Sequence, residues 1–430
     1  MNKRQKFSIL ISANGKAEIT SFAVKSVLEQ KDHLSETEII VMDNARGDNV
    51  KNMLESFRSP NIFYFKTPDY DPAKSVEASY QKSTGDYVLW MCHDDYLLPY
   101  EFNVFEEALE KTGAEVITGH HVYFCDKYHP IVLARNTLKI IDPKDFDCEY
   151  HVLDPKGIVR ILLGVGDSQK DPFAFRIHPI ATLVSRTLLE RIRQKIGFIQ
   201  VPHLMCNQAN QVLTFALAKS VVGIGMPLAI AGRLGILSLT QDFYTKEKVL
   251  WRKRYKFHFS PVSGDTYTNH IRESLLAAVH CLGEDDLKDI DVQSSYVPFF
   301  KGYARSLVLA NQEFFAQRYL FNELEAAVKK FSEKENLTPF IKKQRRLAYF
   351  LQPLKSLNLW RSVINFLVIK DSVYSTLRAT VRRILWGDDQ RRKRHIFIPL
   401  EKYGVQTIAE LAQRLPEIIL KETGKNIYAE

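Results

Sequence analysis

The sequence predicts an α/β fold: a mostly parallel sheet flanked by helices, followed by a mainly helical C-terminal region. Two observations lead to this prediction. From residue 7 to about residue 119, short apolar runs alternate with amphipathic stretches, which is typical of a parallel sheet covered by helices on both faces. The chain has 430 residues, of which 45% are hydrophobic, so it can fill the cores of two or three domains.

The elements follow in order along the chain. The apolar run 7–11 predicts the first strand, and apolar residues at helical spacing between 19 and 27 predict the helix behind it. Four further apolar runs predict strands at 39–42, 62–65, 87–91 and 114–117. Beyond Gly119 the alternation weakens, and we expect a hairpin in which 122–125 pairs with 131–134 across Tyr128-His129-Pro130.

After residue 120, changes in the pattern of apolar residues divide the remaining chain into two parts. We place the boundaries at 1–120, 121–245 and 246–430. Residues 287–337 are mostly helical in pattern, and the helical stretches beyond them are broken at Pro353 and at Gly387.

The positive charge of the chain is concentrated in one segment. The net charge is +9, but residues 342–395 hold 14 Lys and Arg against 3 Asp and Glu, so the rest of the chain carries 9 − 11 = −2. Apolar, aromatic and basic residues alternate at helical spacing in 338–395, which predicts a basic amphipathic segment that associates with an anionic membrane surface. The alternative is a core helix with a solvated basic face. No zinc-finger or RNA-recognition signature is present, so we expect no nucleic-acid partner.

The cysteines and the N-terminus indicate a cytoplasmic protein. Five cysteines occur singly, without a CxxC pair, and are expected to be reduced thiols. The apolar run behind the basic N-terminus ends at Ile11, too short for a signal peptide or a membrane span.

Polar residues follow three of the predicted strands: Ser12-Ala13-Asn14, Asp43-Asn44 and His93-Asp94-Asp95. In open parallel sheets, ligands bind at this edge. Asp94 and Asp95 offer hard oxygen ligands for Mg²⁺ or Mn²⁺, or alternatively an N-terminal helix cap. Asp43 is suited to accept hydrogen bonds from a nucleoside, or alternatively it is a turn residue. Neither GxGxxG nor GxxxxGK[ST] is present, which argues against a dinucleotide fold and a P-loop.

Four blocks of the sequence resemble, in order and spacing, the family-2 glycosyltransferases of GT-A fold. The blocks are Phe7–Asn14, Ser26–Gln30, Glu38–Asn44 and Gly85–Asp95, and a weaker similarity continues through His178–Val184. The resemblance implies that 1–120 is the nucleotide-sugar-binding half of a GT-A domain and 121–245 its acceptor-side half. It further implies a donor site that includes Ser12, Ala13, Asn14, Asp43, His93 and Asp94, and a Mn²⁺ or Mg²⁺ ion held by Asp94 and Asp95.

The sequence departs from the family pattern at three places. Cys92 stands where the family usually has the first acid of its Asp-x-Asp motif. No Asp or Glu occurs between residues 196 and 219, where the family usually has its catalytic base, and Asn210 cannot act as one. Gly235 stands where many relatives have a histidine. The candidate bases that remain are His203 and Asp167, with Asp171 in the same loop as Asp167.

The function expected from the resemblance is transfer of a sugar from a nucleoside-diphosphate sugar to a hydroxyl of a surface glycan, such as lipopolysaccharide or capsule. The acceptor is a glycan or lipid-linked glycan, and the enzyme is expected to be inverting, metal-dependent, and peripheral on the cytoplasmic face of the membrane. The alternative is a catalytically silent partner subunit that binds sugar nucleotide or glycan, which the missing acid near Asn210 motivates.

Overall fold

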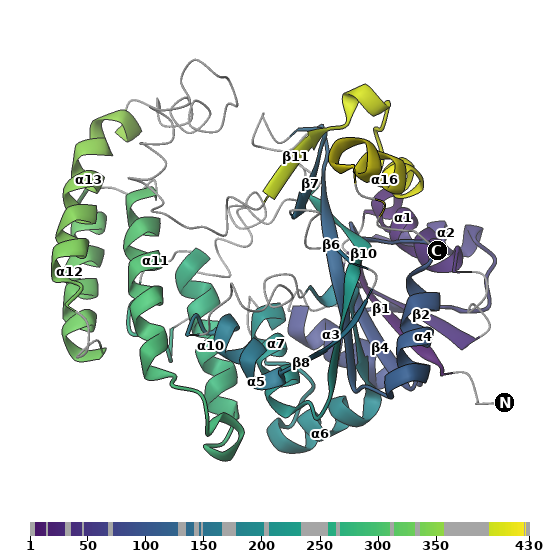
Figure 1. Cartoon of the computed structure of the whole chain (residues 1–430), viewed down its shortest axis with the longest axis horizontal. Helices are drawn as coiled ribbons and strands as arrows, with labels where there is room; N and C mark the ends of the chain where they lie inside the picture. The colour runs from purple at the N-terminus through teal and green to yellow at the C-terminus, as the bar shows by residue number, and fades with distance from the viewer. Residues whose placement is uncertain are drawn as a thin grey trace.

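The computed structural model of the chain describes residues 5–13, 16–30, 36–44, 47–67, 72–127, 135–141, 146–147, 149–165, 178–201, 206–233, 257–263, 267–309, 314–331, 336–356, 395–424 and 426. Within these residues, one sheet lies between helices on its two faces, and a separate group of helices lies to one side of it (Figure 1).

The N-terminal half of the sheet is parallel, as the sequence predicts. Its strand order is β3-β2-β1-β4, and every neighbouring pair in it is parallel. The strands are β1 (Phe7–Ala13), β2 (Thr37–Asp43), β3 (Ile62–Lys66) and β4 (Tyr87–Cys92). Each contains one of the apolar runs that predict it, because a strand covered on both faces needs apolar residues at successive positions.

The second half of the sheet is mainly antiparallel, so the whole sheet is mixed. A short strand, β9 (Thr182–Ser185), runs antiparallel between β4 and β6 (Val116–Cys125). Strand β10 (Val221–Arg233) is parallel to β6 and antiparallel to β5 (Tyr96–Leu97) and β8 (Tyr150–Leu153). The predicted hairpin does form from β6, but its second strand is β7 (Thr137–Ile141), and residues 131–134 lie outside the described part of the chain.

Alternate residues of the central strands face two different helical layers. Ile9 and Ile11 share a core with α1 (Ala17–Leu28), α2 (Asn49–Ser56) and α4 (Glu101–Thr112). Leu10, between them, faces a second core with α3 (Pro72–Lys82), α5 (Pro155–Leu162), α6 (Arg186–Ile196) and α7 (Cys206–Leu217). This alternation is the period of a pleated strand, and it makes the sheet the middle layer of three.

The C-terminal region contains a helical group and a segment that returns to the sheet. Helices α10 (Tyr267–Cys281), α11 (Tyr296–Leu309), α12 (Phe314–Phe331) and α13 (Thr338–Ser356) share a core of their own. Strand β11 (His395–Pro399) instead pairs with β7, and α16 (Ile408–Thr423) contacts α1, β5 and β10. The C-terminal region is therefore mainly helical in its described residues, as predicted, while its last strand and helix return to the sheet.

Single 3₁₀ turns complete the described elements: η4 (Pro179–Ala181), η5 (Asp285–Leu287), η6 (Gln293–Ser295) and η9 (Glu401–Tyr403). In the described part of the chain, no helix combines the length and apolar character needed to span a membrane.

Candidate functional site

Three neighbouring strands end together at one edge of the sheet. In the strand register, Ser12 of β1 lies opposite Cys92 of β4, and Ala13 of β1 lies opposite Asp43 of β2. Because these strands are parallel, their carboxyl ends bring together the polar residues that the sequence singles out. Of the predicted donor-site residues, only Asn14 lies outside the described residues.

Asp43 is fully buried at the end of β2. The Tyr64 hydroxyl donates a hydrogen bond of 3.1 Å to Asp43 Oδ2. Burial, together with the negative charge of Asp43, raises the pKa of Tyr64 to about 12, so the phenol stays protonated and remains a donor. Tyr64 is a site residue that the sequence analysis missed, because it belongs to the neighbouring strand β3.

His93 connects the turn after β4 to the end of β1. Its Nδ1 lies 3.2 Å from the carbonyl oxygen of Ser12. A carbonyl oxygen only accepts hydrogen bonds, so Nδ1 carries the proton and donates it. His93 Nε2 is buried and has no hydrogen-bond partner among the described residues. In the neutral ring, Nε2 therefore has a lone pair available to a donor group.

Asp95 closes the turn instead of capping a helix. Its Oδ2 accepts a hydrogen bond of 2.8 Å from the backbone N–H of Cys92, and its Oδ1 accepts one of 3.3 Å from the backbone N–H of Gly232. The next helix, α4, has Tyr100 as its N-cap, without a side-chain capping bond. The helix-cap alternative is therefore wrong for this pair of acids, since neither Asp94 nor Asp95 is the capping residue.

Gly232 brings the end of β10 against the acidic turn. A Cβ atom at this position would lie 1.9 Å from the backbone oxygen of Asp94. Only a glycine fits so close to another backbone without displacing it. The contact holds the turn in place against the end of β10.

Three side chains that could hold a metal ion lie together at this turn. One ligand atom each from Cys92, Asp94 and Asp95 lies within 4.8 Å of the other two. Cys92 is exposed, Asp94 is partly exposed and Asp95 is buried. Carboxylate oxygens suit Mg²⁺ and Mn²⁺, so the two acids fit such an ion, and the Cys92 thiol adds a softer donor beside them.

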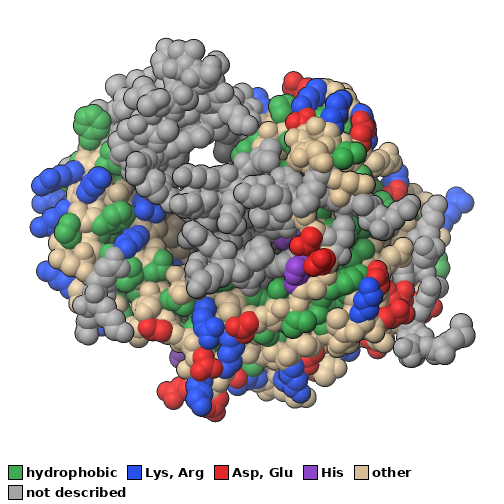
Figure 2. All heavy atoms as spheres, in the orientation of Figure 1, with side chains coloured by type: hydrophobic (Ala, Val, Ile, Leu, Met, Phe, Trp, Pro, Cys, Tyr) green, Lys and Arg blue, Asp and Glu red, His purple; other side chains and the backbone are tan. Residues whose placement is uncertain are grey.

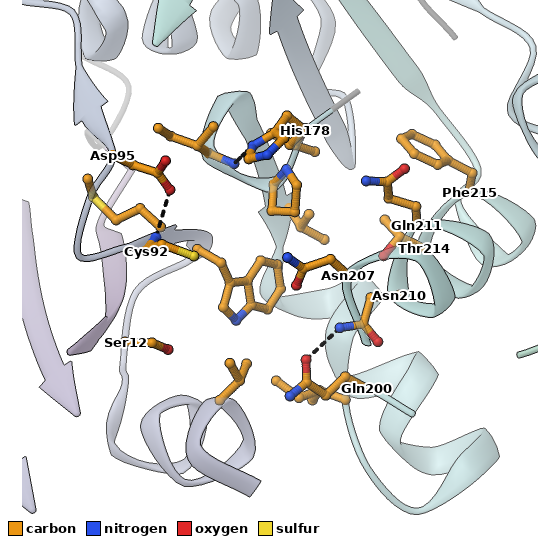
Figure 3. A pocket seen from close by; sticks show the side chains of 18 residues that line it. Ser12, Cys92, Asp95, His178, Gln200, Asn207, Asn210, Gln211, Thr214 and Phe215 are labelled. Carbon is orange, nitrogen blue, oxygen red and sulfur yellow. Dashed lines mark hydrogen bonds between the residues drawn. The ribbon is translucent and has the colours of Figure 1, made fainter. Parts of the chain in front are cut away.

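A pocket extends from the turn toward α7. It holds about 780 Å³ of space, counting its opening to solvent. Ser12, Cys92 and Asp95 line one side (Figure 3), and Trp90 also lines the pocket. Helix α7 forms the opposite wall with Asn207, Asn210, Gln211, Thr214 and Phe215, and carboxamides from it point toward the space.

Asn210 has a structural role in this wall. Its Nδ2 donates a hydrogen bond of 2.5 Å to Gln200 Oε1, and its Oδ1 accepts one of 3.2 Å from the backbone N–H of Val201. The carboxamide therefore fastens the start of α7 to the preceding loop. The candidate bases His203, Asp167 and Asp171, as well as Gly235, lie outside the described residues.

His178 is a pocket residue that the sequence analysis did not select. Its ring centroid lies 4.6 Å from that of His121, which is buried on β6. Its Nδ1 faces the backbone N–H of Ile180 at 3.5 Å, as the N-cap of η4. The signal available in the sequence is a His-Pro pair directly before the apolar run that becomes β9, since such a pair begins a turn at a strand start.

Comparisons with known proteins identify the N-terminal region. Residues 8–176 match the family described as Glycosyl transferase family 2. No curated protein matches the sequence. The structural likenesses that follow are loose, so it is the family match that identifies the domain.

Three solved structures illustrate those likenesses, each at 12% sequence identity. S. aureus TarS 1-349 in complex with UDP-GlcNAc has a TM-score of 0.41, covering 88% of this chain and 92% of that one. S. aureus TarS has a TM-score of 0.46, and the match covers 83% of this chain and 54% of that one. The mannosyltransferase PcManGT from Pyrobaculum calidifontis in complex with GDP-Man and Mn2+ has a TM-score of 0.43, and the match covers 85% of this chain and 88% of that one.

Proposed function

We propose, from the match of residues 8–176 to glycosyl transferase family 2, that the chain transfers a sugar from a nucleoside-diphosphate sugar to a hydroxyl of a surface glycan. The observation that carries this proposal is the sheet edge where Ala13, Asp43, Cys92 and the acidic turn meet. A nucleoside fits beside Asp43, and the sugar then points into the pocket. Inversion at the sugar carbon is the expected outcome for the family.

The proposal includes a divalent cation, Mn²⁺ or Mg²⁺, at the acidic turn. When bound, the ion offsets the charge that develops on the leaving diphosphate. Asp94 is the best-placed protein ligand, because it is partly exposed while Asp95 is buried and accepts two backbone hydrogen bonds. Cys92 is near enough to contribute as well.

The pocket supports a sugar between the turn and α7. Side-chain carboxamides both donate and accept hydrogen bonds, which suits the hydroxyls of a sugar. The Trp90 ring adds an apolar surface to the lining of the pocket. His178 lines the same pocket, and its Nδ1 faces the Ile180 N–H at 3.5 Å.

The base that deprotonates the acceptor hydroxyl is proposed to be His203 or Asp167. Asn210 is excluded by its chemistry and by its structural hydrogen bonds. We propose that the acceptor is a glycan or lipid-linked glycan, and that the protein acts in the cytoplasm as a peripheral protein on the inner face of the membrane. A lipid-linked acceptor requires the site to work close to a membrane surface.

A second candidate function is a catalytically silent subunit that binds sugar nucleotide or glycan. One observation favours it: the pocket wall on α7 presents carboxamides and no acid. Such a protein would bind the donor as the enzyme does, but it would not turn the donor over.

Calorimetric titration with nucleoside diphosphates, with and without EDTA, tests the donor site. We expect chelation and Asp94→Ala each to weaken binding at least tenfold, while Glu55→Ala on the exposed face of α2 has no effect. Cys92→Asp restores the usual family acid and is expected to strengthen binding with Mg²⁺. Binding that survives both chelation and Asp94→Ala would show that the cation has no role.

A further inference from the structure

We propose that the outer face formed by α12 and α13, within residues 318–331 and 338–350, docks on an anionic lipid surface. The two helices lie side by side at the edge of the molecule (Figure 1). Arg345 of α13 bonds to Asn322 and Glu325 of α12, which fixes their antiparallel alignment. This surface lies away from the donor site. The inference rests on the proposed function in one respect: docking would bring the enzyme to a membrane-bound acceptor.

The inner face of the hairpin is an ordinary protein core. Phe321, Leu324 and Val328 of α12 and Ile341 and Ala348 of α13 are buried against α11 and its neighbours. The sequence left open that this segment is a core helix, and one face of α13 does pack in a core. Because one stripe of each helix is buried, the opposite stripes are held rigidly toward solvent.

The outer face is strongly basic. It exposes three basic residues from each helix: Arg318, Lys329, Lys330, Lys342, Lys343 and Arg346. Figure 2 shows Lys and Arg side chains gathered over this edge of the molecule. Basic residues grouped on one face are attracted to the negative surface potential of a membrane that contains anionic lipids.

The acids of the two helices do not cancel this charge at the outer face. Glu325 pairs with Arg345 at 3.0 Å. Glu323 accepts a hydrogen bond of 3.0 Å from the backbone N–H of Ser263. Both side chains are partly buried between elements, so the exposed face is left with its basic residues.

Two aromatic side chains project from the same hairpin. Phe350 is 76% exposed and Tyr319 is 62% exposed, although aromatic side chains of this size usually pack against protein. The antiparallel alignment places both toward the same end of the hairpin, where α12 begins and α13 ends. Exposed aromatics beside a basic face are the pattern of an interfacial membrane anchor, whereas binding to a nucleic-acid backbone would not require them at the rim.

Vesicle co-sedimentation of the full chain tests the proposal. The probes are phosphatidylcholine vesicles with and without phosphatidylglycerol, at low and high salt. We expect binding only to the anionic vesicles, weakened by salt, because screening reduces charge attraction. The variant Lys342→Gln/Lys343→Gln/Arg346→Gln is expected to bind at least tenfold more weakly, and Tyr319→Ser/Phe350→Ser is expected to lose the binding that remains at high salt.

A matched control removes three charges elsewhere. Lys25, Lys51 and Lys111 each expose more than half of the side chain on other helices, so Lys25→Gln/Lys51→Gln/Lys111→Gln has the same net charge as the hairpin variant. Equal loss in both triple variants, no binding to anionic vesicles, or binding to duplex DNA without vesicle binding would each overturn the proposal. Nucleoside-diphosphate affinity, measured on the same variants, is expected to stay unchanged, which separates this inference from the donor site.

Discussion

Asp94 and Asp95 are neighbours in the sequence with different structural surroundings. Asp95 accepts two backbone hydrogen bonds while nearly fully buried, and Asp94 is partly exposed. We expect Asp95→Ala to lower the free energy of unfolding by about 1–3 kcal/mol, because two backbone N–H groups lose their acceptor. Asp94→Ala is expected to change it by less than about 0.5 kcal/mol. Urea denaturation of both variants measures this difference, and equal stabilities would show that Asp95 does not hold the turn.

Glu101, the first residue of α4, is fully buried, and this burial raises the pKa of its carboxyl well above the usual range. Its contribution to stability is therefore complete below about pH 4.3, and it is lost as the pH rises toward the pKa of the folded state. Glu101→Gln removes the titrating group. The variant is expected to gain stability over the wild type as the pH increases, by up to about 1.4 kcal/mol per pH unit.

Denaturation of the wild type and the Glu101→Gln variant at pH 5 and pH 8 checks this expectation. A difference between the two proteins that does not change with pH would mean that Glu101 ionises normally in the folded state.

The position of a site residue could be predicted from the sequence where that residue directly follows a strand. Asp43 and Ser12 follow apolar runs directly, so their place at the sheet edge could be predicted. The role of Asp95 could not, because its hydrogen-bond donor at Gly232 is remote in the sequence and meets the turn only through β10. His178 was missed because the ring it packs against, His121, lies far away in the sequence on β6.

At the scale of elements, the meeting of β10 with the turn after β4 shapes the site. Gly232→Ala is expected to displace the turn, because its Cβ would lie 1.9 Å from the Asp94 oxygen. We expect at least tenfold weaker binding of nucleoside diphosphate with Mn²⁺, measured by calorimetry. Gly302→Ala is the control, since its nearest neighbour would be an ordinary 3.7 Å contact with Thr268. Unchanged affinity in Gly232→Ala would mean that the turn does not bind the donor.

Some helices and strands could be predicted from the sequence, and others could not. The parallel strands β1 to β4 could be predicted, because each is an apolar run in alternation with helices. The short strands β9 and β11 could not, because their pairing with β4, β6 and β7 is decided by tertiary contacts and not by local pattern. The same limit explains why the hairpin partner of β6 was placed too early in the chain.

At the scale of the whole molecule, the C-terminal helix α16 belongs to the sheet domain. Leu415 is fully buried there among residues of β6, β7 and β10. We expect Leu415→Ala to cost about 2–5 kcal/mol of stability, as large-to-small changes in a core do. Leu420 on the same helix is 47% exposed, so Leu420→Ala is expected to cost less than about 0.5 kcal/mol. Thermal and urea unfolding compare the two, and similar costs would mean that α16 is not docked on the sheet.

We propose that this chain is a cation-dependent nucleotide-sugar transferase that uses the edge formed by β1, β2 and β4. The most direct measurement is release of nucleoside diphosphate from a panel of nucleotide sugars, with Mn²⁺ or Mg²⁺ and a glycan acceptor. We expect release from at least one donor, lost on chelation and reduced at least a hundredfold in Asp94→Ala, with Glu55→Ala unaffected. Tight binding of a donor without any release would contradict the claim and would favour the silent sugar-nucleotide-binding subunit.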